Sequence, residues 1–426
     1  MSTQLEGVLT VWHYSNFLGH YLLLGKEKKM NNDTNINSSS KGSYVVDTIK
    51  VAGAYLAFFI GSGYATGQEI LQFFTSFGWQ GMITAGISLI LCIWMGVTII
   101  RDGRLLNVQS GGIMWEYYCG KVVGKAFDYF ALFIQFGVFV VMIGGAGAAV
   151  ETYLGLPSMV GRVGMAIVCM LSVLLGLQKL IDVLGAIGPV IIVFTIIVGI
   201  YSIIHNWGSL SEVSSNMQGL EILKSCNNPA LSGVLYVGFN AMYVMPFLFS
   251  MGPTVKAMKT GKIGGALGGV LLVCAIVIMM TAQLLSIKLL YNAQIPTLVL
   301  TGAISPAVSG VFTVIILLGI YSTAAGLLWL VCDRVGRRNR KVFVSTNVII
   351  VVATIILSVL PFSKLVNIVY GWSGWIGLVA IAIFVARQTF LFKKERIEEY
   401  QRIDVERNEA YDAKKAAKLA NKQSNG

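Results

Sequence analysis

The feature that most constrains this chain is a series of long apolar stretches. About 20 apolar residues in a helix can span a bilayer, because a helix rises ~1.5 Å per residue and the hydrocarbon core is ~30 Å thick. The sequence therefore predicts an all-α integral membrane protein with ten transmembrane helices, which we number spans 1 to 10. They run over residues 45–74, 79–100, 122–148, 158–177, 181–204, 229–258, 263–288, 307–332, 342–360 and 366–392.

Composition agrees with this class and excludes others. Hydrophobic residues make up 55% of the chain and charged residues 12%. Soluble proteins carry roughly 25% charged residues, so this chain cannot cover several water-facing cores. Its three histidines and six cysteines form no metal-binding pattern, and no nucleophile with a base is visible. We therefore expect neither an enzyme nor a bound cofactor, apart from a coupling ion.

The charge balance predicts the orientation in the membrane. An even number of spans places both termini on one side. Lys and Arg in the predicted loops on that side outnumber those on the other by thirteen to four. Cytoplasmic loops carry such an excess, so both termini are predicted to be cytoplasmic. The net charge of +12 has the same explanation and is no sign of nucleic-acid binding.

The predicted core, residues 44–392, divides into two blocks of five spans, 45–204 and 229–392. Five is an odd number, so the second block enters the membrane from the opposite side. The two blocks therefore predict an inverted repeat, which is a common plan of secondary transporters.

Polar segments flank this core. Residues 1–43 form an N-terminal extension. Lys26-Glu27 can be encoded as a bacterial ribosome-binding sequence just before Met30, so we expect translation to start at Met30 and residues 1–29 to be a start-site artefact. The polar stretch 31–43 is predicted to be disordered. Residues 393–426 form a charged cytoplasmic tail.

Spans 1 and 6, the first of each block, carry residues that interrupt helices. Gly61, Gly63 and Gly67 lie close together in span 1, and glycine costs a helix ~1 kcal/mol per residue. Span 6 contains Pro246 with Asn240 before it, and proline removes a hydrogen bond from a helix. Close helix packing at the glycines and a simple proline kink are the alternatives. Interruptions at matching places in both blocks favour two broken helices.

Two connections add to this pattern. Residues 101–121 are long enough for a short helix on the cytoplasmic side, between spans 2 and 3. Residues 294–300, between spans 7 and 8, are apolar but too short to cross the bilayer. They are predicted to form a lid over the outer opening.

Ten spans, interruptions in spans 1 and 6, an inner helix and an outer lid resemble the LeuT-type fold of the amino acid–polyamine–organocation superfamily. More narrowly, the motif at 61–69, with Phe73 and Phe74 after it, resembles YkvI-type bacterial membrane proteins, a group placed among amino-acid permeases. The resemblance covers about residues 44–392. It implies a secondary transporter in the bacterial cytoplasmic membrane.

The resemblance also implies a solute site at the interruption of span 1. There the solute carboxylate would meet free backbone N–H groups at the positive end of a half-helix. Gln135 is equally well explained by a hydrogen bond between helices. The implied solute-binding residues are Gly61, Ser62, Gly63, Gln135, Phe239, Asn240 and Tyr243.

A sodium site between spans 1 and 8 is implied in the same way. Its ligands would be the carbonyl oxygens of Ala57, Ile60 and Gly319 and the hydroxyls of Ser322 and Thr323. The alternative is that these hydroxyls bond only to their own helix. Proton-driven relatives can carry a lysine in span 5 instead of sodium, and this chain has none there.

Glu69 has no role in a transporter that is coupled to sodium alone. It is nevertheless a functional candidate, because ionisable groups inside membrane spans usually have a function. It is interpreted as a proton-coupling carboxyl or a contact for a solute amine, or else as a structural acid. Asp47 and Lys50, near the inner end of span 1, are read as a cytoplasmic gate contact or as interface residues.

These observations predict a secondary active transporter for a small amino-acid-like, or other zwitterionic or anionic, solute, coupled to sodium. Its partners would be that solute and the lipid bilayer. A proton-coupled carrier using Glu69 and a ligand-sensing receptor on the same fold, like the subunits of spore germination receptors, are the alternatives. A channel would need a continuous polar lining, which the spans lack.

Overall fold

The computed structural model describes residues 38–59, 62–107, 112–175, 187–336 and 340–390. These residues form helices and their connections, with no strand among them. The predicted extension up to residue 37, the tail from residue 391, and the join between spans 4 and 5 lie outside the described residues.

The first predicted span is divided into three helices: α2 (Ser38–Phe59), α3 (Ser62–Thr66) and α4 (Gln68–Phe73). Gly67, between α3 and α4, has φ +79°, a left-handed conformation that favours glycine. An interruption of span 1 was predicted from these glycines. α2 begins before residue 44, so the stretch predicted to be disordered is helical from Ser38 onwards.

The other predicted spans each contain a longer helix. These are α5 (Gly81–Leu106), α6 (Gly112–Leu154), α7 (Ser158–Leu175), α9 (Ile187–His205), α11 (Pro229–Met251), α12 (Met258–Leu285), α15 (Pro306–Gly336), α16 (Arg340–Leu357) and α17 (Phe362–Phe390). Within the described residues, seven helices are long and apolar enough to cross a membrane, or up to eight if one bent pair counts as a single span. The predicted ten-span count is therefore supported only in part.

Short helices connect these long ones. The predicted inner helix corresponds to the first turns of α6, which a non-helical residue, Gly120, separates from the rest. The predicted lid is a helix, α14 (Pro296–Ile304). The others are η1 (Thr75–Gln80), η2 (Trp207–Glu212), α10 (Val213–Asn216), η3 (Gly252–Thr254) and α13 (Ile287–Leu290).

The predicted interruption of span 6 is wrong, because α11 is one helix with Pro246 inside it. Proline removes only its own N–H from the hydrogen-bond ladder. Pro246 also lies in the last two turns, where the Ser250 hydroxyl donates to the carbonyls of Pro246 and Phe247 at 2.6 and 3.1 Å. The chain therefore stays helical until η3 begins at Gly252.

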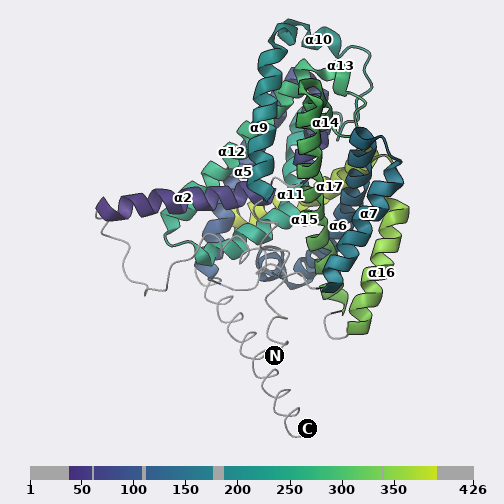
Figure 1. Cartoon of the computed structure of the whole chain (residues 1–426). Coiled ribbons are helices and arrows are strands. Elements are labelled where there is room, and N and C mark those ends of the chain that lie inside the picture. Colours follow the sequence, from purple (N-terminus) through teal and green to yellow (C-terminus); the bar gives the residue numbers. More distant parts are fainter. Residues whose placement is uncertain (1–37, 60–61, 108–111, 176–186, 337–339, 391–426) are drawn as a thin grey trace.

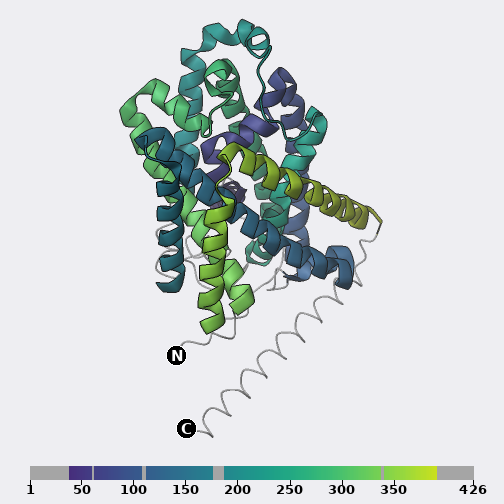
Figure 2. The same cartoon turned by 90° about the vertical axis from the view of Figure 1, so that its right-hand side faces the viewer.

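The helices are packed around α5, α11, α12 and α17. α5 packs against both α11 and α12, α11 packs against α17, and α2 packs against α12. Figure 1 shows α2 running across the view, while α9 and α16 run from top to bottom. Figure 2 shows α17 and α16 from the side, with α6 behind them.

Glycines allow the central helices to approach closely. A Cβ atom placed on Gly238 of α11 would lie 2.6 Å from the carbonyl oxygen of Gly374 on α17. Gly96 on α5 and Gly265 on α12 face each other in the same way, so that a Cβ on either would overlap the backbone of the other. Small residues are typical of such close crossings in membranes.

The bundle has two ends, which we call the α10 end and the η3 end. α10 contacts both η1 and α13 at the α10 end, at the top of Figure 1. η3 packs against α5 near Gly103 and Arg104, which lie at the opposite end of α5 from η1.

Candidate functional site

The interruption of span 1 holds a buried carboxyl group. Glu69 lies in the first turn of α4, and only 6% of it is exposed. A Cβ atom on Gly63 would overlap the Glu69 carboxylate and would lie 3.1 Å from the hydroxyl oxygen of Tyr370 on α17. The Glu69 carboxylate, the Gly63 backbone and the Tyr370 hydroxyl therefore lie next to one another.

Glu69 has no hydrogen-bond or ion-pair partner among the described residues. Its carboxylate interacts electrostatically, at longer range, with the hydroxyls of Tyr236, Tyr243 and Tyr370. Buried carboxylates are normally paired or hydrogen-bonded. An unpaired one in a helix interruption is a candidate for binding a ligand or a proton.

Aromatic rings from three helices pack together next to this carboxyl group. Phe239 of α11 stacks on Tyr370 of α17, with ring centroids 4.6 Å apart and planes 9° apart. Phe73 of α4 lies 5.6 Å from Phe239. Tyr236, one turn before Phe239, contacts both of these phenylalanine rings. The side chains that pack near Glu69 are therefore largely aromatic, with tyrosine hydroxyls as their polar groups.

α2 contributes rings on the side of Tyr243. Phe58 stacks on Phe247 at 4.0 Å and lies 6.1 Å from Tyr243, all between ring centroids. The Tyr243 hydroxyl donates to the Asn240 side-chain oxygen, and the Asn240 amide donates to the Tyr236 carbonyl at 2.9 Å. Both ends of the Asn240 side chain are thus used within α11.

The structure brings together part of the predicted solute site. Gly63, Phe239 and Tyr243 all adjoin the group around Glu69. Gln135 lies on α6, which packs against α3, α11 and α17, and its side-chain oxygen is buried without a hydrogen-bond partner among the described residues. Gly61 lies outside the described residues, and the Ser62 side chain is also outside them.

Sequence reasoning missed Tyr370, Tyr236 and Phe58. Tyr370 carried a signal that could have been used, because it is a polar-tipped aromatic residue inside a predicted span. What the sequence does not contain is the pairing of α17 with α4 and α11, which brings Tyr370 next to Gly63.

Of the predicted sodium site, the structure describes the side chains of the part on α15, in span 8. α15 packs against α3, so spans 1 and 8 are adjacent. The Thr323 hydroxyl donates to the Gly319 carbonyl at 3.2 Å, and Ser322 is half-buried. Ile60 and the Ala57 side chain lie outside the described residues. Two of the five predicted ligands are therefore bonded to each other, and the site remains a prediction.

A network of polar side chains joins three segments towards the α10 end. We call Gln72, Gln294, Ser363 and Asn367 the Gln72 network. The Gln72 amide donates to the Ser363 carbonyl at 2.7 Å, and Asn367 donates to the Gln72 side-chain oxygen at 3.1 Å. The Ser363 N–H donates to Gln294, just before α14, at 3.0 Å. The network therefore links α4, the start of α17 and the predicted lid.

At the η3 end an ion pair connects α2 with the segment after η3. Lys256 Nζ lies 2.7 Å from the Asp47 carboxylate, and the Lys256 side chain is 62% exposed. Arg104, at the end of α5, donates to the carbonyls of Val255 and Lys256. Asp47 was predicted to form either a gate contact or an interface contact, and the structure gives it this partner.

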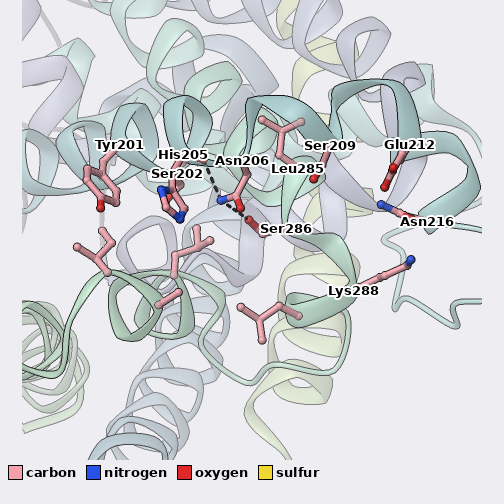
Figure 3. Close-up of a pocket in the computed structure, with 14 residues that line it drawn as sticks. Tyr201, Ser202, His205, Asn206, Ser209, Glu212, Asn216, Leu285, Ser286 and Lys288 are labelled. Atoms are coloured by element: carbon pink, nitrogen blue, oxygen red, sulfur yellow. Dashed lines mark hydrogen bonds between the residues drawn. The ribbon is translucent and has the colours of Figure 1, made fainter.

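A separate pocket of about 410 Å³ opens at the α10 end. It lies where the chain bends by 80° between α9 and the helices η2 and α10. Figure 3 shows Tyr201, His205 and Asn206 on one side and Glu212 and Lys288 near the other. Its charged side chains are exposed, in contrast to Glu69.

Comparison with known proteins supports the resemblance drawn from the span 1 motif. No model of a known protein family matches the chain. The uncharacterized membrane protein YkvI of Bacillus subtilis is 25% identical over 359 residues, which cover 82% of this chain and 97% of YkvI. The uncharacterized protein YyaD of the same organism is 26% identical over 216 residues, covering 50% of this chain and 59% of YyaD.

Solved transporter structures share the fold. MhsT in complex with L-phenylalanine superposes with a TM-score of 0.57 at 14% identity, covering 84% of this chain and 91% of MhsT. The inward-facing conformation of Mhp1 gives 0.54 at 15% identity, covering 86% of this chain and 82% of Mhp1. The chain is thus a multi-pass membrane protein of LeuT-type fold and similar to YkvI, and the proteins it resembles are membrane proteins and transporters rather than enzymes.

Proposed function

We propose that this protein is a secondary active transporter that carries a small amino-acid-like solute across the bacterial cytoplasmic membrane. The observation that carries the proposal is Glu69, a buried and unpaired carboxyl at the interruption of span 1. Interrupted helices form the solute sites of many secondary transporters near the middle of the bilayer. The fold shared with MhsT, which was solved with L-phenylalanine, supports this function.

In this proposal all ten predicted helices cross the membrane as two inverted blocks of five. The α10 end then faces outwards and the η3 end faces the cytoplasm, as the excess of Lys and Arg in the loops predicts. The Gln72 network would lie on the outer side of the solute, and the Asp47–Lys256 pair on the cytoplasmic side. Contacts of this kind on each side of a site suit alternating access.

The solute site in this proposal lies between α3, α4, α6, α11 and α17. The aromatic rings near Glu69 favour a solute with an apolar side chain, because such rings bury large apolar area. The residues proposed for it are Gly61, Ser62, Gly63, Gln135, Phe239, Asn240 and Tyr243.

We further propose that sodium drives transport. The ion would lie between spans 1 and 8, held by oxygen atoms, which suit a hard cation. The Thr323 hydroxyl can donate to the Gly319 carbonyl, as it does here, and still offer an oxygen lone pair to the ion. The proposed ligands are Ala57, Ile60, Gly319, Ser322 and Thr323.

Counterflow in proteoliposomes tests the transport function. Vesicles that contain the purified protein and a high internal concentration of unlabelled amino acids should accumulate trace external labelled L-phenylalanine or leucine. Gly63→Ala should reduce this exchange, because the added methyl group pushes the Glu69 carboxylate aside. Gly53→Ala on α2 is the matched control, since nothing lies within 4 Å of a Cβ there.

The receptor alternative predicts a different result in the same experiment. A receptor binds its ligand but does not exchange it across the bilayer. Saturable binding in detergent without counterflow in vesicles, for every amino acid tried, would refute the transporter and favour the receptor.

A further inference from the structure

We propose that the solute presents a positively charged amine to the interruption of span 1 and that the Glu69 carboxylate binds it. This inference rests on the proposed function, since it concerns the solute of the same site. It names the chemical class of that solute: a primary amine attached to an apolar, preferably aromatic, body. Solutes that are only anionic are excluded.

The first reason is the state of Glu69 itself. The side chain is more than nine-tenths buried, and it has no hydrogen bond or ion pair with any residue in the described part of the chain. Removing a carboxylate from water without a partner is unfavourable, whereas a cation in contact offsets much of that cost. None of the described residues supplies such a cation at this point, so a solute amine would complete the pair.

The second reason is where the carboxylate lies. It occupies the space next to the Gly63 Cα atom, where the family resemblance would place the carboxylate of the solute. Two carboxylates at that position would repel each other. The helices that begin there are also short, five residues in α3 and six in α4, so their dipoles offer an anion little. The local charge therefore favours the amine end of the solute.

The third reason is the aromatic surroundings. The rings of Phe239, Tyr370 and Tyr236 pack together at this site, and an aromatic face that is not covered by another ring attracts ammonium groups. The Tyr370 hydroxyl adjoins the same volume as the carboxylate and can accept a hydrogen bond from an amine. One carboxylate with several aromatic rings is a suitable environment for an alkylammonium group.

The experiment uses matched pairs of probes with the same apolar body, of which one carries an ammonium group and the other a carboxylate. The amines are phenethylamine, tyramine and isopentylamine. The acids are 3-phenylpropionate, 3-(4-hydroxyphenyl)propionate and 4-methylpentanoate. Binding to the purified full chain is measured by the rise in melting temperature and by titration at constant ionic strength and pH.

We expect at least one amine to bind the wild-type protein and its matching acid not to bind. Glu69→Gln should weaken amine binding by roughly 30-fold or more, because one partner of a buried charge pair is lost. The empty Glu69→Gln protein should melt no lower than the wild type, since the substitution removes no hydrogen bond or ion pair with the described residues. Glu151→Gln, an exposed glutamate on α6, is the control and should bind amines as the wild type does.

Three results would overturn the inference: acids that bind as well as their amines, amine binding that survives Glu69→Gln, or no amine in the panel that binds. Counterflow of a labelled amino acid separates this failure from failure of the transporter. If counterflow occurs but binding does not depend on the amine, the transport function is supported and the amine-binding role of Glu69 is refuted. If amines bind through Glu69 but no amino acid or amine exchanges, the site stands and the transport function falls.

Discussion

Gly238 lies at the closest approach of α11 to α17, and we expect alanine at this position to separate the two helices. A Cβ there would be 2.6 Å from the Gly374 carbonyl oxygen and 3.0 Å from the Leu378 nitrogen, and both are backbone atoms that cannot rotate away. Ordinary van der Waals contacts of a Cβ begin near 3.4 Å. The helices must therefore move apart by about 0.8 Å along this contact, from the difference of the two distances.

The cost follows from that displacement. A gap of about 0.5–1 Å removes a quarter to a half of the dispersion energy of the atoms that face it. Overpacked sites typically lose ~1–3 kcal/mol of folding free energy. Alanine also gains ~1 kcal/mol of helix propensity over glycine. Alanine gains the same helix propensity at Gly371 on α17, where nothing lies within 4 Å of a Cβ. The difference in stability between Gly238→Ala and Gly371→Ala therefore reports the crowding at Gly238 alone.

The assay compares the melting temperatures of wild type, Gly238→Ala and Gly371→Ala, purified in the same detergent. Gly238→Ala should be less stable than Gly371→Ala by about 1–3 kcal/mol. Phe239 adjoins the crowded position and stacks on Tyr370, so ligand binding should weaken as well. Equal melting temperatures for the two variants would show that α11 and α17 do not pack this closely.

Three further predictions concern polar contacts. Thr323→Ala should remove the dependence of ligand binding on sodium at fixed ionic strength; if the hydroxyl serves only the Gly319 carbonyl, titrations with and without sodium will keep their difference. Gln72→Ala should lower the free energy of unfolding by ~1–3 kcal/mol, because it leaves the buried Ser363 carbonyl without its donor; an unchanged melting temperature would contradict this. Asp47→Asn should change global stability by less than ~1 kcal/mol, since Lys256 is mostly exposed. Its effect should appear instead as faster hydrogen exchange in the segment after η3, and identical exchange there would argue against a structural role for the pair.

The interruption of span 1 could be predicted from sequence because its cause is local. Three glycines in seven residues weaken a helix wherever it packs, and Gly67 has a backbone conformation that favours glycine. The interruption predicted for span 6 failed because one proline near the end of a helix removes a single hydrogen bond.

The surroundings of Glu69 could be predicted only in part. Phe239 and Tyr243 were implied by the resemblance to LeuT-type transporters. Tyr370 was not, because its place depends on how α17 packs against α4 and α11, and these segments are far apart in sequence. The Gln72 network was missed for the same reason, since Gln72 and Ser363 are 291 positions apart.

The division of span 1 has a mechanical consequence. An unbroken helix would turn as one rod, so contacts at both of its ends would have to break together. Here α2 is tied at the η3 end to Lys256 by a mostly exposed ion pair, which contributes ~0.2–1 kcal/mol, and further along to α5 by a buried hydrogen bond from the Tyr55 hydroxyl to the Cys92 carbonyl. α4 is tied to α17 by buried hydrogen bonds of ~0.5–1.5 kcal/mol each. Because span 1 is divided, the Asp47–Lys256 pair at the η3 end can break while the Gln72 network at the α10 end stays intact.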